Sequence, residues 1–169
     1  MFAAIIQHTP LWVWGVLAAL TAAGMAQLRS RDMSVARMTL VPALLTALSA
    51  AGVLSAFGRS PVAIGAWFTG LLLAGLLGRL LLAPRGASWS AATARVRVPG
   101  SWLPLALMLG LFAIKFGVGV VLAMHPGLAT DAEFSVVCSL AYGTFSGLFL
   151  GRALALRAVA ASESTLQPA

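Results

Sequence analysis

The sequence predicts an all-α membrane protein, a bundle of five transmembrane helices with the N-terminus outside and the C-terminus in the cytoplasm. Of its 169 residues, 60% are hydrophobic and 9% are charged, and the mean hydropathy is +0.97. A water-soluble domain of this size carries far more charge on its surface. The apolar residues form long continuous stretches, whereas a transmembrane barrel needs alternating strands of about ten residues. Arginines border these stretches mainly on one side, which predicts the orientation.

Each predicted span is long enough for a bilayer, because about 20 residues at ~1.5 Å rise cover the ~30 Å hydrocarbon layer. In the first span, Thr9 is the expected N-cap and Pro10 the first helical residue. The first basic residue, Arg29, follows this apolar stretch, so we expect the helix to be retained rather than cleaved as a signal peptide. Residues 1–169 form a single transmembrane domain, with spans at residues 11–28, 38–57, 62–82, 101–124 and 134–158.

The longest polar connector is a cytoplasmic loop at residues 84–100, which contains Arg85, Arg95 and Arg97 and no acidic residue. Its Arg95–Val98 segment alternates with period two, which predicts a short extended piece or hairpin. We expect this loop to lie at the membrane interface. The sharper hypothesis is that its three arginines contact anionic lipid headgroups or a partner protein.

Lys115 lies near the middle of the fourth span and is the residue that packing explains least. A lysine at the bilayer midplane costs about 2.5–3.5 kcal/mol on insertion scales. No aspartate or glutamate lies inside any predicted span, so the chain offers no buried ion-pair partner there. Three interpretations remain open: a lysine that reaches toward water, a binding or gating residue, and a contact with another subunit.

The fifth span offers Lys115 its nearest polar neighbours. Counted from the outer ends of their spans, Lys115 and Tyr142 lie within ~2 Å of the same depth. A phenol or a serine hydroxyl accepts a hydrogen bond from an ammonium group. We therefore predict that Lys115 points toward Tyr142 or Ser139, and that these three residues form a binding site.

The fifth span also carries Gly143, Gly147 and Gly151, which are spaced four apart and so line one helix face. In lipid, small residues let two backbones approach closely, so this pattern predicts helix packing. The partner helix is either internal or in another subunit, so a homo-oligomer or a membrane-protein partner is compatible with the pattern. The candidate counterpart is Gly110, Gly117 and Gly119 in the fourth span. In the third span Gly70, Ala74 and Gly78 repeat the spacing, which is unsurprising in a sequence rich in alanine and glycine.

Basic residues collect on the predicted inner side, where the positive-inside rule places the cytoplasm. Anionic headgroups of the bilayer are the expected partner, because no arginine-rich block carries the interleaved aromatics that favour nucleic acid. The outer side has Arg59 together with Asp131 and Glu133. The inner side has Arg29, Arg31, Arg37, Arg79, Arg85, Arg95, Arg97, Arg152 and Arg157.

Patterns for catalysis or metal binding are absent from the sequence. It contains no HExxH, GxSxG or Walker A motif, and no spaced cluster of His, Cys, Asp and Glu. A single cysteine, Cys138, excludes an internal disulfide and a CxxC redox pair. We expect no catalytic residue, no metal and no cofactor.

Several segments resemble a known family. They are HTPLWVW at 8–14, LVPALL at 40–45, GVLSAFG at 52–58, VPGSWLPL at 98–105 and YGTFSGLFLGRAL at 142–154. Together they resemble a family of uncharacterised bacterial inner-membrane proteins that is similar in outline to CcdC-like membrane proteins. The resemblance implies a multi-pass protein of the bacterial cytoplasmic membrane and assigns no activity.

Two functions fit these observations. The first is a non-enzymatic accessory or structural membrane protein, supported by the glycine face and the missing catalytic groups. The alternative is a small carrier or channel subunit that binds an anion or a lipid headgroup near Lys115. A water-filled cavity that reaches Lys115 would favour the alternative, and a solid apolar seal around the lysine would favour the first. An intramembrane enzyme has the least support, because no nucleophile–base pair is within reach.

Overall fold

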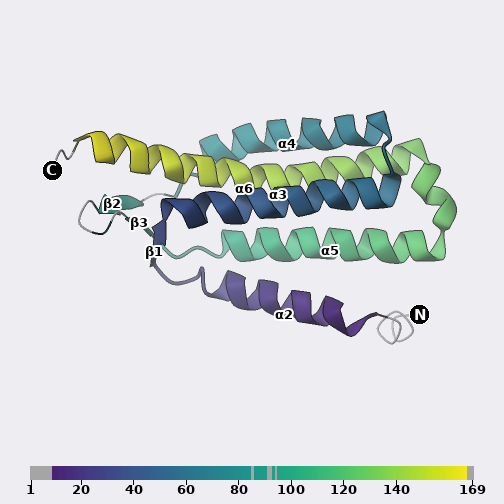
Figure 1. The fold of residues 1–169 in the computed structure, drawn as a ribbon, viewed down its shortest axis with the longest axis horizontal. Coiled ribbons are helices and arrows are strands. Elements are labelled where there is room, and N and C mark those ends of the chain that lie inside the picture. The colour runs from purple at the N-terminus through teal and green to yellow at the C-terminus, as the bar shows by residue number, and fades with distance from the viewer. Residues whose placement is uncertain (1–8, 85, 91–92, 94, 167–169) are drawn as a thin grey trace.

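The computed structural model describes residues 9–84, 86–90, 93 and 95–166, and this part of the chain is mostly helical. The helices lie side by side along the long axis, with a small sheet at one end (Figure 1). A 3-10 helix, η1 (Pro126–Thr130), joins the last two helices at the opposite end. The described α-helices are α2 (Leu11–Met25), α3 (Val35–Phe57), α4 (Pro61–Leu81), α5 (Leu103–Met124) and α6 (Ala132–Leu166).

Four of these helices, α3 to α6, are long and apolar enough to cross a membrane. Their outer faces carry exposed leucines, as lipid contact requires; on α4, Leu72 is 68% exposed and Leu80 is 66% exposed. The helical class predicted from the sequence is therefore confirmed.

The first predicted span, at residues 11–28, is shorter in the structure than expected. Helix α2 has 15 residues, so at ~1.5 Å per residue it covers only about 22 Å. After Met25 the chain forms turns at Gln27 and Leu28 and then enters a strand. The N-cap position is Pro10, not the expected Thr9, and a proline side chain has no group that could accept a cap hydrogen bond. A fifth full-length span is thus not present among the described residues.

Two serine side chains and one aspartate side chain act as N-caps of three long helices, α3, α4 and α6. The hydroxyl of Ser34 accepts from the backbone N of Arg37 at the start of α3. The hydroxyl of Ser60 accepts from Ala63 N at the start of α4, where Pro61 is the first helical residue. Asp131 accepts from Phe134 N at 2.7 Å before α6. These caps fix where the connectors end and the bundle begins.

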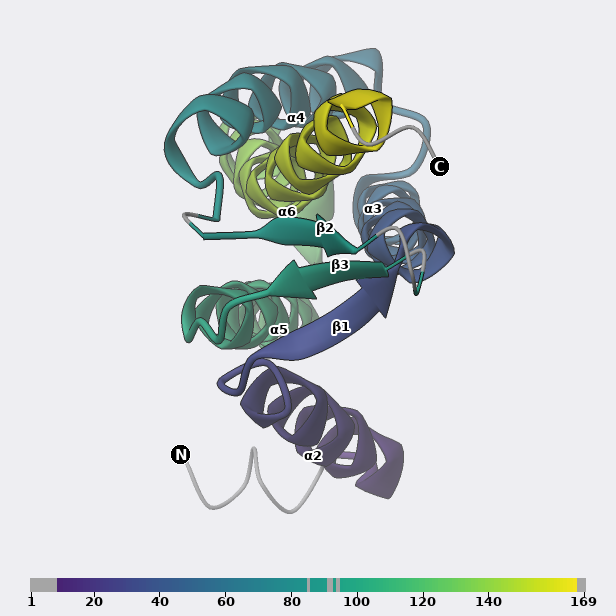
Figure 2. The same cartoon turned by 90° about the vertical axis from the view of Figure 1, so that its left-hand side faces the viewer.

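The sheet lies across the helix ends at the side where α6 ends, between α6 and α2 (Figure 2). Its order is β1-β3-β2 and both pairings are antiparallel. The extended segment predicted within residues 84–100 is present as the β2–β3 pair, whereas the third strand comes from the first basic connector, which the sequence did not indicate. The strands are β1 (Arg31–Ser34), β2 (Ser88–Ser90) and β3 (Arg95–Val98).

Alternation along β3 gives the sheet a buried face and an exposed one. Val96 and Val98 are 0% and 6% exposed and form a cluster with Met33, Met38 and Leu156. The sheet is therefore packed onto the start of α3 and the end of α6. This cluster ties the two basic connectors to the bundle.

Helix α6 is the centre of the bundle, and its glycine face lies against α4. A Cβ at Gly143 would meet the backbone of Trp67 and Leu71, and one at Gly151 would meet Gly75 and Arg79. The described chain thus covers this face internally. In contrast, no described atom lies within 4 Å of where a Cβ would stand at Gly117 or Gly119 on α5. The expected counterpart on α5 is therefore wrong, because the glycine face packs on α4. Gly70 and Gly78 of α4 face Leu140, Thr144 and Leu148 of α6 instead of its glycines. The α4 residues that meet the glycine face are Trp67, Leu71, Ala74, Gly75 and Arg79.

Candidate functional site

A cavity of about 860 Å³ lies between α2, α3, α5 and α6. It exists because α2 packs on α5 mainly near its C-terminal end, where Gly24 contacts Leu105, and diverges from α5 toward its N-terminal end (Figure 1). This volume is within the range of small-molecule sites, ~300–1,000 Å³. The apolar wall includes Trp12, Val13, Val16, Leu20, Leu45, Leu48, Leu107, Met108, Leu111, Phe112, Phe116, Phe145 and Phe149.

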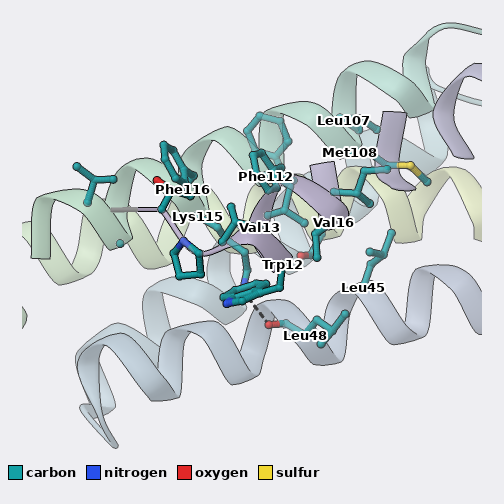
Figure 3. Close-up of a pocket in the computed structure, with 18 of the residues that line it drawn as sticks. Trp12, Val13, Val16, Leu45, Leu48, Leu107, Met108, Phe112, Lys115 and Phe116 are labelled. Carbon is teal, nitrogen blue, oxygen red and sulfur yellow. Dashed lines mark hydrogen bonds between the residues drawn. The ribbon is translucent and has the colours of Figure 1, made fainter. Parts of the chain in front are cut away.

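Lys115 is the one charged side chain among the described residues that line this cavity. Its ammonium group donates a hydrogen bond to the carbonyl oxygen of Leu48 at 3.0 Å, drawn as the dashed line in Figure 3. The same nitrogen is 5.4 Å from the centre of the Tyr142 ring, which is cation–π distance. Lysine has three donors, so the Leu48 bond leaves capacity for a ligand.

Gly52 on α3 leaves room for the Lys115 side chain, because glycine has no side chain of its own. A Cβ at Gly52 would meet the Lys115 ammonium group, so the missing side chain leaves the crevice in which the lysine lies. The lysine therefore approaches the backbone of α3, one turn away from Gly52, and satisfies part of its hydrogen-bonding need there. This contact explains how a charged group is kept inside an apolar bundle.

The structure places two of the three predicted binding residues together. Lys115 lies over the ring face of Tyr142, and its acceptor is a backbone carbonyl of α3 rather than a hydroxyl of α6. Ser139 is 0% exposed, and its hydroxyl has no hydrogen-bond partner among the described residues. The predicted acceptor, a hydroxyl of α6, is therefore replaced by the Leu48 carbonyl, which lies within reach of the Lys115 ammonium group beside Gly52. Counting residues along α5 and α6 compares the depths of those two helices only, so it could not predict the position of α3.

A buried hydrogen-bond network behind Tyr142 was not anticipated from the sequence. The indole N–H of Trp67 donates to the hydroxyl of Ser49 at 3.1 Å, and that hydroxyl donates to the carbonyl of Tyr142 at 3.2 Å. It connects α4, α3 and α6 at the depth of the lysine. The signal that could have indicated it is the pair of small residues on α3, Ser49 and Gly52, which are three apart and so share a face.

Ser146 is a second polar residue of the cavity that sequence reasoning missed. It is 1% exposed, lines the cavity, and its hydroxyl has no hydrogen-bond partner in the described part of the chain. It lies one helical turn from Tyr142, so a ligand group near the lysine is within a turn of this hydroxyl. Lys115 and Ser146 are thus two donors that the cavity offers in the neighbourhood of Tyr142.

Comparison with known families agrees with the expectation of an uncharacterised family. A family described as "Family of unknown function (DUF6622)" matches residues 1–167. The chain belongs to this family. The searches of curated proteins and of solved structures found no match. Membership in DUF6622 assigns no chemistry, and the likeness to CcdC-like proteins and the bacterial origin stay predictions.

Two of the three arginines predicted to contact headgroups lie at the sheet end of this DUF6622 protein. Arg95 and Arg97 lie on the exposed face of β3, and Arg97 is paired in register with Asp32 on β1. Arg85 lies outside the described residues. In the described part of the chain, no group of three or more His, Cys, Asp and Glu side chains is placed to hold a metal ion.

Proposed function

We propose that the protein is a non-enzymatic membrane protein that binds an apolar ligand with an acidic group, with the apolar part in the cavity and the acidic group at Lys115. The observation that carries this proposal is the position of Lys115 in the wall of a largely apolar cavity of about 860 Å³. This is the carrier or binding-subunit function rather than the purely structural one.

The chemistry of the cavity selects the ligand class. Its aliphatic and aromatic wall favours a hydrocarbon chain, because burying apolar surface contributes about 25 cal/mol per Å². In such surroundings a carboxylate or phosphate that bonds to an ammonium forms a charge-assisted hydrogen bond, roughly twice as strong as a neutral one. Ser146 adds a second donor within one helical turn of Tyr142. A fatty acid or another single-chain acidic lipid meets both requirements.

The proposal includes a location in the bacterial cytoplasmic membrane, with the sheet end in the cytoplasm. Clustering of arginines on the connectors and helix ends near the sheet supports this orientation under the positive-inside rule. Helix α2 would be a fifth, short crossing around which the bilayer thins, at a modest cost per ångström of mismatch. Arg85, Arg95 and Arg97 would then meet anionic headgroups of the inner leaflet.

The structural function remains the second candidate, because the bond from Lys115 to the Leu48 carbonyl also holds α5 against α3. The two candidates differ in what Lys115→Met does. A lysine retained for binding is a net cost to the bundle, so its removal leaves stability unchanged or raises it. If Lys115 instead stabilises the fold, loss of its hydrogen bond lowers the free energy of unfolding by about 1–2 kcal/mol.

The test compares oleate with oleyl alcohol, which share a chain and differ in charge. Each is titrated into purified protein in detergent, and binding is followed by quenching of Trp12 with brominated analogues; Trp12→Phe supplies the background signal. We expect oleate to bind about tenfold more tightly than the alcohol, Lys115→Met to abolish that preference, and Lys115→Arg to keep it. Equal affinity of the wild-type protein for both ligands would refute the proposal.

A further inference from the structure

A second, smaller cavity lies at the sheet end, where Arg152 of α6 lines it three residues after Phe149, which lines the first cavity. Its volume is about 330 Å³, and it lies between the end of α4, the segment after β3 and the start of α5. Its lining includes Leu82, Ala83, Ser101 and Arg152. Nothing in the proposed function uses this cavity.

Arg152 is the charged group of this second cavity. It is 9% exposed, and its guanidinium donates a hydrogen bond to the carbonyl of Leu82 at 3.1 Å. A guanidinium has five N–H donors, so this bond leaves most of them for another acceptor. A charged group with so little exposure is costly unless an opposite charge or further hydrogen bonds compensate.

The surroundings of Arg152 are positive. Burial lowers the pKa of Arg31, and the charge of Arg37 lowers it further. Arg31 in turn is close enough for its charge to repel that of Arg152. The start of α5 at Leu103 adds the positive end of a helix dipole to the lining of the cavity. Arg152 in the cavity wall therefore has a positive neighbour, Arg31, and a helix start beside it, and an anion in the cavity would relieve this repulsion.

We infer that this second cavity is a binding site for a phosphate group, with Arg152 as the main residue that binds it. A guanidinium presents paired N–H groups that match two phosphate oxygens. The depth of the site also fits a phosphate. Helix α6 is about 52 Å long, well beyond the ~30 Å hydrocarbon layer, and Arg152 lies in its C-terminal half, near the sheet. The phosphate is supplied either by an anionic lipid headgroup or by a soluble phosphate.

The experiment uses the full chain, delipidated in detergent, with phosphatidylglycerol, phosphatidylcholine and inorganic phosphate as probes. Lipid binding is measured by native mass spectrometry, and inorganic phosphate is added as a competitor. We expect phosphatidylglycerol to bind at least tenfold more tightly than phosphatidylcholine, and Arg152→Gln to remove this difference. Arg157→Gln, an exposed arginine on the same helix, is the matched control and should keep it.

The probes separate the two sources of phosphate. If the lipid binds and inorganic phosphate competes only weakly, the source is a headgroup; if inorganic phosphate alone binds, and does so through Arg152, the source is soluble. Equal losses in Arg152→Gln and Arg157→Gln would show a general charge effect and overturn the inference. So would binding of neither probe to the wild-type protein.

A second variant covers the case in which Arg152→Gln does not fold. Ala83 is exposed and lies in the connector after α4, so Ala83→Glu places a negative charge at the cavity while Arg152 stays in place. We expect at least a tenfold loss of phosphatidylglycerol binding, and unchanged binding would overturn the inference. Lys115→Met should leave this binding intact, which separates the site from the apolar cavity.

Discussion

Gly147→Ala tests the contact on which the bundle depends most. A Cβ at this position would meet the carbonyl oxygen of Leu71, the backbone nitrogen of Gly75 and the Cβ of Ala74. Two of these three are backbone atoms, so no change of rotamer makes room for the new methyl group. Helices α4 and α6 must separate locally, and the contacts on either side of the glycine loosen with them.

The expected magnitude follows from two opposing terms. Alanine favours a helix over glycine by about 0.5–1 kcal/mol. Overpacking of a close contact costs typically about 1–3 kcal/mol. The net change is a loss of about 1–2 kcal/mol in the free energy of unfolding, which for a chain of this size lowers the Tm by roughly 2–8 °C.

Thermal unfolding in detergent measures this change, with Gly65→Ala as the control. Gly65 lies on α4, and no described atom is within 4 Å of the place that its Cβ would take, so the propensity gain acts there without the clash. A double variant with Gly143→Ala should lose less than the sum of the two single losses, because one separation of the helices relieves both clashes. A Gly147→Ala protein as stable as Gly65→Ala would show that this close contact is not formed.

Three further predictions follow from the polar groups and the connectors. Gly52→Val fills the crevice and displaces Lys115, so we expect oleate to lose its roughly tenfold advantage over oleyl alcohol while the Tm changes by only a few degrees. Ser49→Ala leaves a buried indole N–H without its acceptor and should lower the free energy of unfolding by about 1–3 kcal/mol, measured by denaturant titration. For orientation, a membrane-impermeant maleimide applied to intact cells should label Gly127→Cys and not Ser88→Cys, against a background from buried Cys138; the reverse pattern would invert the proposed topology.

Local patterns in the sequence were enough to predict the helical class, the approximate bounds and the polarity of α3, α4 and α5, and the tendency of β3 to form a strand. These properties depend on local periodicity and on hydropathy summed over about 20 residues. The predicted span at residues 134–158 was too short, because α6 covers Ala132–Leu166. The importance of Lys115 was also visible, because a charge in an apolar stretch is conspicuous without any structure.

Which surfaces meet became clear only from the packing of the helices. The small residues of the fourth span suggested α5 as the partner of the α6 glycine face, but this face lies against the backbone of α4. The acceptor of Lys115 comes from α3, a helix far away in the chain, and the cavity exists because α2 diverges from α5. In the sequence nothing distinguishes Arg152 from the other arginines, whereas the fold places it in the wall of a cavity and close to Arg31. Such contacts depend on how helices are arranged around each other, and residue order does not encode that arrangement locally.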